Sequence, residues 1–257
     1  MITSTTNNRI KKLVALSQKA KLRREEDVFL VEGPRMFVEA PKSWIREVYV
    51  SESFLAKCSF LEELKTQPYE VVSDEVFQKI SDTKTPQGIL SVLKCPHYEM
   101  KELLQKENPL LVVLENIQDP GNLGTILRAG EGAGIDGVIM TRETADLFNP
   151  KVIRATMGSI YRVPYFYTDD IQGSIAELKN RGIAVYAAHL SDSVCYDEPD
   201  YQEGTAFLIG NEGNGLKKET ADSATQYIKI PMQGQVESLN AAIATSILMY
   251  EAARQRK

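Results

Sequence analysis

Residues 206–216 read AFLIGNEGNGL, an apolar run followed directly by a turn with three glycines in six residues. The run does not alternate apolar with polar residues, which is typical of a strand buried on both faces of a parallel sheet. The glycine-rich turn lies where the carboxyl end of that strand is expected, and ligands of parallel α/β sheets bind beyond the carboxyl ends of the strands. This stretch therefore predicts both an α/β fold and the place of a binding site.

Similar apolar runs recur on both sides of this stretch. They are LLVVLENI (110–117), GVIM (137–140), AVYAAH (184–189) and QYIKI (226–230). Helices are expected between them at 122–132, 146–158, 171–181 and 216–223, with a final helix at 239–256. Repeated strand–helix alternation predicts a three-layer α/β domain with a mostly parallel sheet over residues 109–257.

The first part of the chain predicts a second, smaller α/β domain over residues 1–95. Strands are expected at FLVEG (29–33), REVYV (46–50), YEVVS (69–73) and GILSVL (88–93). Helices are expected at 7–19, 53–65 and 74–81. The polar, proline-flanked residues 96–108 predict a linker.

Composition excludes several classes of protein. The 257 residues contain no apolar run near the ~20 residues that span a membrane, and the N-terminus lacks the apolar core of a signal peptide. Three cysteines without a common spacing favour a reducing, cytoplasmic location. His97 and His189 are the only histidines, so neither a histidine-rich metal site nor a Ser-His-Asp triad is expected. We therefore expect no bound metal.

Positive charge is concentrated at the N-terminus although the net charge of the chain is −5. Residues 1–24 carry seven Lys or Arg and no acid. A local basic patch can hold a phosphate backbone even on an acidic protein. The candidate RNA-binding residues are Arg9, Lys11, Lys12, Arg23 and Arg24. A solvated helix face explains the same pattern.

Gly132, Gly134 and Gly137 match the G-x-G-x-x-G spacing of dinucleotide-binding proteins. That motif must follow a strand and begin a helix. Here the glycines end a helix and precede the run GVIM, so they predict a helix C-cap and a turn.

Three polar clusters follow apolar runs and stand out as candidate site residues. The first is Asn122 with Arg128, the second is the turn at 210–213, and the third is Ser238 with Asn240. Each cluster also has an ordinary structural interpretation, which for the residues at 210–213 is a solvated turn. Asn122 and Ser238 are good helix N-caps, and Arg128 can pair with Glu131 on one helix. Asn240 is less expected, because asparagine is a modest helix former and we place it one residue inside the last helix.

In this order and over residues 110–256, the clusters resemble the three motifs of the SpoU (TrmH-type) RNA ribose 2′-O-methyltransferases, a branch of the SPOUT methyltransferases. FLVEG and DTKTPQGIL (82–90) resemble the substrate-binding domain, related to ribosomal protein L30e, that precedes the catalytic domain in rRNA-directed members. The resemblance implies a C-terminal trefoil knot, which general topology rules would not predict.

The resemblance further implies transfer of a methyl group from S-adenosylmethionine (SAM) to a ribose 2′-hydroxyl of RNA. Large-subunit rRNA is the first expectation and tRNA the second. The implied catalytic residues are Asn122, Arg128, Glu212, Ser238 and Asn240. The implied SAM-binding residues are Leu208, Gly210, Asn211, Gly213, Ile230, Met232, Ser238 and Leu239. Arginine stays protonated in proteins, so Arg128 is expected to act as an electrostatic aid and phosphate clamp rather than as a base.

Two further expectations concern partners. A homodimer is expected, partly from the resemblance and partly because the helix at 239–256 is apolar on several faces. A buried position within one chain explains the same helix. A non-catalytic RNA-binding or ribosome-assembly protein that keeps the fold is the alternative function from a different class.

Overall fold

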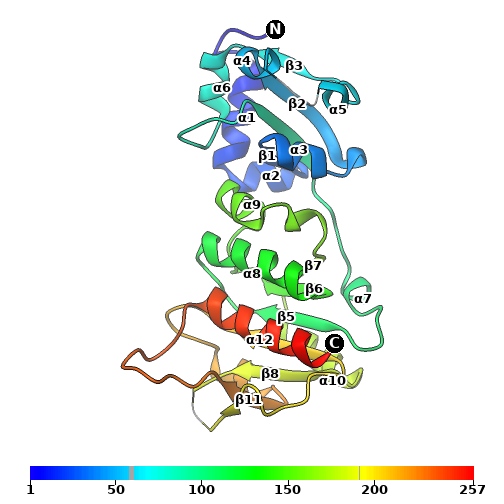
Figure 1. Ribbon diagram of the computed structural model, residues 1–257, viewed down its shortest axis with the longest axis vertical. Coiled ribbons are helices and arrows are strands. Elements are labelled where there is room, and N and C mark those ends of the chain that lie inside the picture. The colour runs from blue at the N-terminus through cyan, green and yellow to red at the C-terminus, as the bar shows by residue number, and fades with distance from the viewer. Residues whose placement is uncertain (58–60, 191) are drawn as a thin grey trace. The chain divides into compact units, whose positions relative to one another are not determined.

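A computed structural model describes residues 1–57, 61–190 and 192–257 of the chain. These residues form two compact units (Figure 1). Unit 1 comprises Met1–Pro96 and Asp146–Tyr161, and unit 2 comprises His97–Ala145 and Arg162–Lys257. Residues 146–161, which the sequence pattern grouped with 109–257, thus pack with the N-terminal residues.

Unit 1 contains a four-stranded sheet in the order β1-β4-β2-β3. Its strands are β1 (Val28–Glu32), β2 (Ile45–Ser51), β3 (Glu70–Val72) and β4 (Ile89–Lys94). Only the pair β2–β3 is parallel. Its helices are α1 (Asn8–Gln18), α2 (Ala20–Glu26), α3 (Pro34–Glu39), α4 (Glu52–Leu55), α5 (Leu61–Lys65), α6 (Asp74–Ile80) and α9 (Pro150–Thr156), with 3-10 turns at Lys42–Trp44 and Ser159–Tyr161. The helix expected at 53–65 is thus divided between α4 and α5, and residues 58–60 lie outside the described residues.

The opening helix shows how local sequence places the core of unit 1. The Asn7 side chain accepts a hydrogen bond from the backbone N–H of Arg9 and so caps α1. Ile10, Leu13 and Leu16 then recur on one face and are buried against one side of the sheet.

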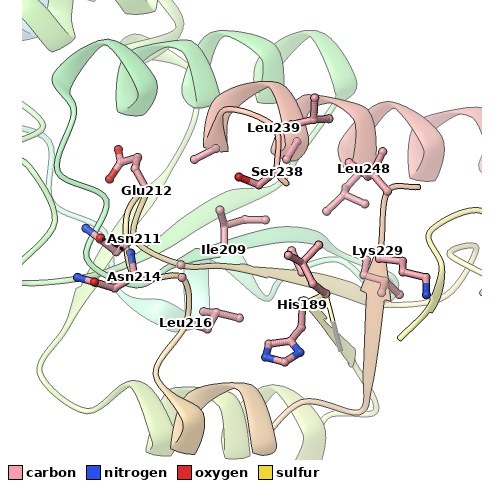
Figure 2. Close-up of a pocket in the computed structure, with 18 of the residues that line it drawn as sticks. His189, Ile209, Asn211, Glu212, Asn214, Leu216, Lys229, Ser238, Leu239 and Leu248 are labelled. Carbon is pink, nitrogen blue, oxygen red and sulfur yellow. Dashed lines mark hydrogen bonds between the residues drawn. The ribbon is translucent and has the colours of Figure 1, made fainter. Parts of the chain in front are cut away.

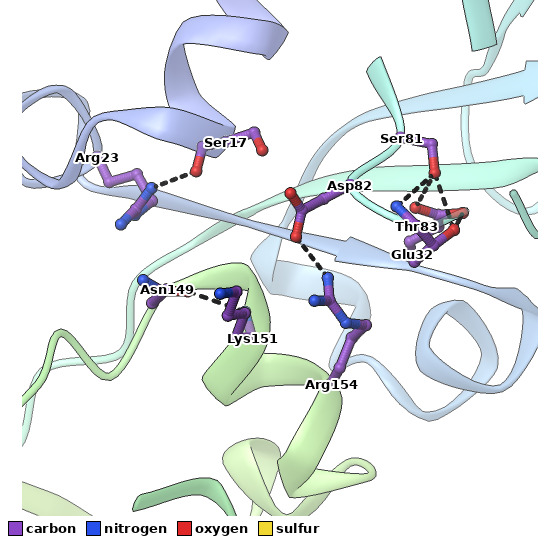
Figure 3. Close-up of polar contacts among 9 residues, drawn as sticks. All are labelled: Ser17, Arg23, Glu32, Ser81, Asp82, Thr83, Asn149, Lys151 and Arg154. Carbon is purple, nitrogen blue, oxygen red and sulfur yellow. Dashed lines mark hydrogen bonds and ion pairs between the residues drawn. The ribbon is translucent and has the colours of Figure 1, made fainter. Parts of the chain in front are cut away.

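Residues 146–161 belong to unit 1 through both apolar and charged contacts. The Phe148 ring packs against Phe29 of β1 with ring centroids 4.8 Å apart. Arg154 of α9 donates to Asp82 at 2.6 Å, as Figure 3 shows. Because these partners are distant in sequence, the pattern of residues 146–158 alone could not assign them to unit 1.

Unit 2 contains a seven-stranded sheet in the order β7-β6-β5-β10-β8-β11-β9, with every neighbouring pair parallel. Its strands are β5 (Leu110–Leu114), β6 (Gly137–Thr141), β7 (Tyr165–Thr168), β8 (Ala184–Ala188), β9 (Val194–Cys195), β10 (Thr205–Ile209) and β11 (Gln226–Lys229). Its helices are α7 (Met100–Leu103), α8 (Pro120–Ala133), α10 (Ile171–Asn180), α11 (Lys218–Asp222) and α12 (Ala241–Gln255). The predicted α/β fold with a mostly parallel sheet is confirmed.

The strand β10 separates two packed faces of unit 2. Leu208 is buried in one cluster with Ile175 and Leu178 of α10. The next residue, Ile209, faces a cavity that Leu248 of α12 also lines. Successive strand residues point to opposite faces, so α10 and α12 cover opposite sides of the sheet, and α12 packs beside α8 (Figure 1).

Two local predictions can be compared with the observed backbone. Gly134 adopts φ 79° and ends α8 as a left-handed cap, so the glycines at 132–137 form a helix end as predicted. The expected linker at 96–108 contains α7, whose Met100 and Leu103 are buried in the core of unit 2.

No helix within the described residues is long and apolar enough to cross a membrane. Those same residues contain no cluster of three or more His, Cys, Asp or Glu arranged to hold a metal ion.

Candidate active site

A cavity of about 470 Å³ lies at the carboxyl ends of β8, β10 and β11 and reaches the start of α12 (Figure 2). Its walls come from four segments that are far apart in the chain. They are Ala188, His189 and Leu190; Ile209 to Leu216; Ile228, Lys229, Ile230 and Met232; and Ser238, Leu239, Ala241, Ala244 and Leu248. The glycine-rich turn at 210–215 is therefore one wall of the cavity.

Seven of the eight residues expected to bind the cofactor line this cavity. They are Gly210, Asn211, Gly213, Ile230, Met232, Ser238 and Leu239. The exception is Leu208, which is fully buried on the α10 side of the sheet. Its expected place is taken by Ile209, because a shift of one residue along a strand moves a side chain to the other face.

The turn at 210–215 holds its shape through its own residues. The Asn211 side chain accepts from the backbone N–H of Gly213 and of Asn214, both at 3.0 Å, and donates to the carbonyl of Asn116 at 2.9 Å. A Cβ at Gly210 would lie 2.1 Å from the backbone nitrogen of Leu216. Glycine is thus required at 210 by the turn itself, before any ligand is considered.

The three predicted motifs meet in a chain of hydrogen bonds. Asn240 Nδ2 donates to Asn122 Oδ1 at 2.9 Å, and Asn122 Nδ2 donates to Glu212 Oε1 at 2.9 Å. The Glu212 carboxylate also accepts from the backbone N–H groups of Gln118 and Asp119, each at 3.0 Å. Residues from α8, the 210–215 turn and the start of α12 are thereby fixed against one another.

The direction of every bond in this chain follows from its two ends. Asn240 Oδ1 accepts from the backbone N–H groups of Ala242 and Ile243, so its Nδ2 must point away from the helix and donate. Asn122 must then offer its oxygen to Asn240, which turns its amide nitrogen toward Glu212. A carboxylate that only accepts is the matching end of the chain.

Both predicted caps of these helices are wrong, for the same local reason. Asp119 caps α8 by accepting from the Asn122 N–H at 2.8 Å, and Pro120 takes the first helical position. Asn240, not Ser238, caps α12. With Asp119 and Asn240 as caps, the Asn122 side chain is free to bond across to Glu212 and Asn240.

The Glu212 carboxyl is held in its charged form. Burial by itself would raise its pKa, but the hydrogen bonds from Asn122, Gln118 and Asp119 outweigh burial and lower the pKa below the ordinary 4.5. Folding therefore favours the carboxylate, and its contribution to stability is present above about pH 4.5 and lost as the pH falls through the folded-state pKa.

We expect this contribution to appear as a pH-dependent difference between the wild type and Glu212→Gln. The melting temperature of the wild type should exceed that of the variant at pH 7, and the gap should shrink as the pH falls below about 4.5. Thermal unfolding of both proteins between about pH 7 and about pH 4 measures this difference in melting temperature. A gap that widens toward acid would contradict this assignment.

Arg128 lies on α8 but does not line the cavity. Its side chain is exposed, and it forms neither an ion pair nor a hydrogen bond with any residue that the structure describes. The alternative interpretation, a pair with Glu131, is wrong, because Glu131 bonds to Arg162 instead. The guanidinium of Arg128 remains open to solvent or to a partner molecule.

The expected RNA-binding residues of unit 1 differ in whether their side chains can reach a phosphate. Arg23 is buried, donates to the backbone carbonyls of Leu16 and Ser17, and pairs with Asp146. Figure 3 shows its bond to Ser17. Arg23 therefore serves the fold and cannot reach a phosphate, which corrects the sequence prediction for this residue.

The exposed basic residues of α1 are partly neutralised by acids from elsewhere in unit 1. Arg9 pairs with Glu47 and Glu70, and Lys12 pairs with Glu26. Lys11 and Arg24 are exposed. The surface of α1 is therefore less positive than the sequence of residues 1–24, which contains no acid, predicted.

Several lining residues carried no sequence signal of their own. His189, Lys229 and Leu248 line the cavity but lie in ordinary strand and helix patterns. His189 follows β8 directly and Lys229 ends β11. The rule that ligands bind at the carboxyl ends of parallel strands could have identified both.

The fold and the cavity together define an α/β protein with a cavity suited to a small molecule at the carboxyl ends of parallel strands. Residues 109–250 match the SpoU rRNA methylase family, and residues 7–91 match the MRM3-like substrate binding domain. The chain is 34% identical over 251 residues to the 23S rRNA (guanosine(2553)-2′-O)-methyltransferase RlmP of Bacillus subtilis, covering 97% of each protein.

Solved structures agree with this match over nearly the whole chain. An rRNA methyltransferase from Sinorhizobium meliloti superposes with a TM-score of 0.85 at 33% identity, covering 98% of this chain and 96% of the other. The SpoU methyltransferase AviRb from Streptomyces viridochromogenes, in complex with the cofactor AdoMet, superposes with a TM-score of 0.88 at 26% identity, covering 97% and 98%. The chain belongs to the SpoU rRNA methylase family. The predicted class of enzyme, an RNA methyltransferase that uses SAM, is confirmed by this membership.

Proposed function

We propose that this protein transfers a methyl group from SAM to a ribose 2′-hydroxyl of large-subunit rRNA, as part of rRNA processing in the cytoplasm. The observation that carries the proposal is the hydrogen-bond chain Glu212–Asn122–Asn240. It joins all three predicted motifs at the edge of one cavity. Membership of the family and the similarity to an rRNA ribose methyltransferase support the choice of substrate.

The cavity suits SAM in size and in chemistry. Ligand pockets commonly measure about 300–1,000 Å³ and combine apolar walls with a few polar groups, and this one measures about 470 Å³. Ile209, Leu239 and Leu248 offer apolar surface, while the turn at 210–215 offers backbone groups. When bound, SAM supplies a methyl group carried on a sulfonium.

The residues of the chain would position the ribose and favour loss of the proton from its 2′-hydroxyl. The fixed amide and carboxylate groups of Asn122, Glu212 and Asn240 form a rigid polar edge against which a ribose can be oriented. Ser238 lines the cavity beside this edge. Arg128, always protonated, would clamp a phosphate of the RNA and favour loss of the hydroxyl proton through its charge.

The family resemblance supports two structural features of this proposal. Unit 1 is assigned as an L30e-like domain that binds RNA, in line with the match of residues 7–91 to a substrate-binding domain. Lys11 and Arg24 are its exposed candidates for phosphate contact. The C-terminal segment of unit 2 is assigned a trefoil knot, which would hold the 210–215 turn and the start of α12 together.

The proposal includes a homodimer formed through α12. Ile243 and Tyr250 are 52% and 53% exposed, and Ile247 between them is half-buried. Their spacing of four and three residues places them on one stripe of the helix. Met249 and Ala252, in contrast, are fully buried within the chain. Intrachain packing therefore explains part of the apolar character of α12, and the exposed stripe is the candidate interface.

We expect Ile243→Asp to yield a monomer, because a charge at the centre of an apolar interface would be buried without a partner. Light scattering at micromolar concentration would measure the mass. Val38→Asp, which adds the same charge to an exposed apolar position of unit 1, should leave the dimer intact. A wild-type mass near 28.7 kDa, the mass of one chain, would contradict the dimer.

The function is tested by mapping ribose methylation in RNA from cells with and without the gene. One 2′-O-methyl group of large-subunit rRNA should be missing from the deletion strain. The purified wild-type protein with SAM should restore it on extracted RNA. An unchanged methylation pattern in rRNA, or a loss confined to tRNA, would overturn the proposal.

A further inference from the structure

Unit 2 has a second cavity, of about 150 Å³, that the SAM site does not use. It lies at the carboxyl ends of three neighbouring strands, where Glu115 follows β5, Thr141 ends β6 and Thr168 ends β7. This edge is where parallel α/β sheets bind ligands. A cavity of roughly 150 Å³ accommodates one aromatic ring, so its volume suits a single heterocycle rather than a whole cofactor.

The second cavity shares a wall with the proposed active site. Asn116 lines it, and the Asn116 carbonyl accepts from Asn211, which lines the SAM cavity. Gln118 donates through its side chain to Asn116 Oδ1 at 2.5 Å and through its backbone to Glu212 at 3.0 Å. A ring bound here would therefore lie beside the polar edge that orients the ribose.

The walls of this cavity are rigid because their polar groups are already bonded. The buried Glu115 carboxylate accepts from the backbone N–H of Lys217 at 2.8 Å and from Thr220 Oγ1 at 2.6 Å. Asn116 adopts φ 59°, a left-handed conformation, and its N–H donates to Thr141 Oγ1 at 3.0 Å. Fixed walls of this kind discriminate between ligands by shape.

Two charged side chains on the lining remain available to a ligand. The Glu143 carboxylate and the Lys217 ammonium both line the cavity and are exposed. Neither side chain bonds to any residue in the described parts of the chain. Arg142, by contrast, is held by Asp169 through two bonds of 2.9 and 3.3 Å. The cavity thus offers a carboxylate, which can accept two hydrogen bonds side by side, and an ammonium cation, which can donate one.

We propose that this cavity takes the six-membered ring of a guanine base of the RNA substrate, with the five-membered ring at its mouth, next to the ribose that receives the methyl group. Guanine presents two adjacent N–H donors, which match both oxygens of a carboxylate, beside a carbonyl acceptor that matches an ammonium. Adenine, cytosine and uracil lack this combination on one edge. The inference rests on the proposed function, because it assigns a specificity subsite to the same reaction.

The test replaces guanosines near the methylated ribose one at a time by inosine, which lacks only the exocyclic amino group. The substrate is a transcript of the host large-subunit rRNA, and the readout is kcat/KM for methyl transfer. For the wild type, one replacement should lower kcat/KM about tenfold or more, the effect of removing one hydrogen bond to a carboxylate.

Glu143→Gln should lower kcat/KM on the unmodified RNA to a similar extent and should no longer distinguish inosine from guanosine at that position. Lys217→Met should lower kcat/KM as well but should still distinguish the two bases. SAM affinity, measured by calorimetry, should be unchanged in both variants and shows that unit 2 is folded. Glu219→Gln and Lys218→Met make the same changes at exposed neighbouring positions outside the cavity and should behave as wild type.

Wild-type kcat/KM in Glu143→Gln and Lys217→Met, or a wild type indifferent to every inosine, would overturn the base site while leaving the methyltransferase proposal intact. Failure of the wild type to methylate any RNA would overturn the proposed function and this assignment together.

Discussion

Asn122→Asp is expected to lower kcat for RNA methylation by about 100-fold or more while leaving the affinity for SAM close to that of the wild type. The new carboxylate would face Glu212 at the 2.9 Å now spanned by a hydrogen bond. Two charges at that distance repel by about 6 kcal/mol at an effective dielectric constant of ~20. The polar edge would open, and a displacement of about 1 Å in a positioning group can cost about 100-fold in rate.

A matched control and a pH series separate this effect from general damage. Asn8→Asp makes the same change on an exposed position of α1 in unit 1 and should leave kcat unchanged. The repulsion vanishes when one of the two carboxyls at 122 and 212 takes up a proton. The melting-temperature gap between wild type and Asn122→Asp should therefore narrow as the pH falls. If the folded Asn122→Asp protein had the kcat of the wild type, Asn122 would not be part of the active site.

Much of unit 2 could be predicted from sequence because its signals are local. The run at 206–209 became β10, and the helices expected at 122–132 and 171–181 correspond to α8 and α10 within one or two residues. Buried parallel strands and amphipathic helices each carry their pattern within a dozen residues. The same locality explains why three separate polar clusters could be placed at strand ends.

The errors arose where two neighbouring residues could fill one role. Asp119 and Asn122 both suit an N-cap, and the signal that decides between them is Pro120, which favours the first helical position. Leu208 and Ile209 are both apolar strand residues, and only the register of β10 in its sheet determines which one faces the cavity.

Contacts between segments far apart in the sequence could not be predicted from local sequence patterns. Arg23 is a basic residue in a basic stretch, and nothing near it in sequence shows that Asp146 will pair with it. The grouping of residues 146–161 with unit 1 has the same origin, since Phe148 and Arg154 find partners more than 70 residues away. Such contacts become visible only when the chain is folded.

A large loss of stability is also expected from Arg256→Ala at the end of the chain. The Arg256 guanidinium donates to the backbone carbonyls of Tyr201 at 2.7 Å, Asn108 at 2.9 Å and Glu203 at 2.5 Å. Burial lowers the pKa of Arg256, yet an arginine remains charged at neutral pH. Its bonds therefore tie the end of α12 to the segments that precede β5 and β10.

Removal of the guanidinium would leave those carbonyls without their charged donor. Hydrogen bonds to charged groups contribute about 1.5–3 kcal/mol each, and with partial compensation by water we expect a net loss of about 3 kcal/mol. For a chain of this size that corresponds to a fall of roughly 6–12 °C in melting temperature. Circular dichroism during heating measures it.

Arg254→Ala is the matched control for this change. Arg254 lies two residues earlier, is exposed and pairs with Glu251 on the surface of α12. Surface ion pairs contribute little, so its removal should lower the melting temperature far less than Arg256→Ala. Because Leu248 and Ala244 of the same helix line the cavity, loosening its end should also weaken SAM binding in Arg256→Ala alone. Equal melting temperatures for the two variants would show that α12 is held by its apolar packing and not by this terminal arginine.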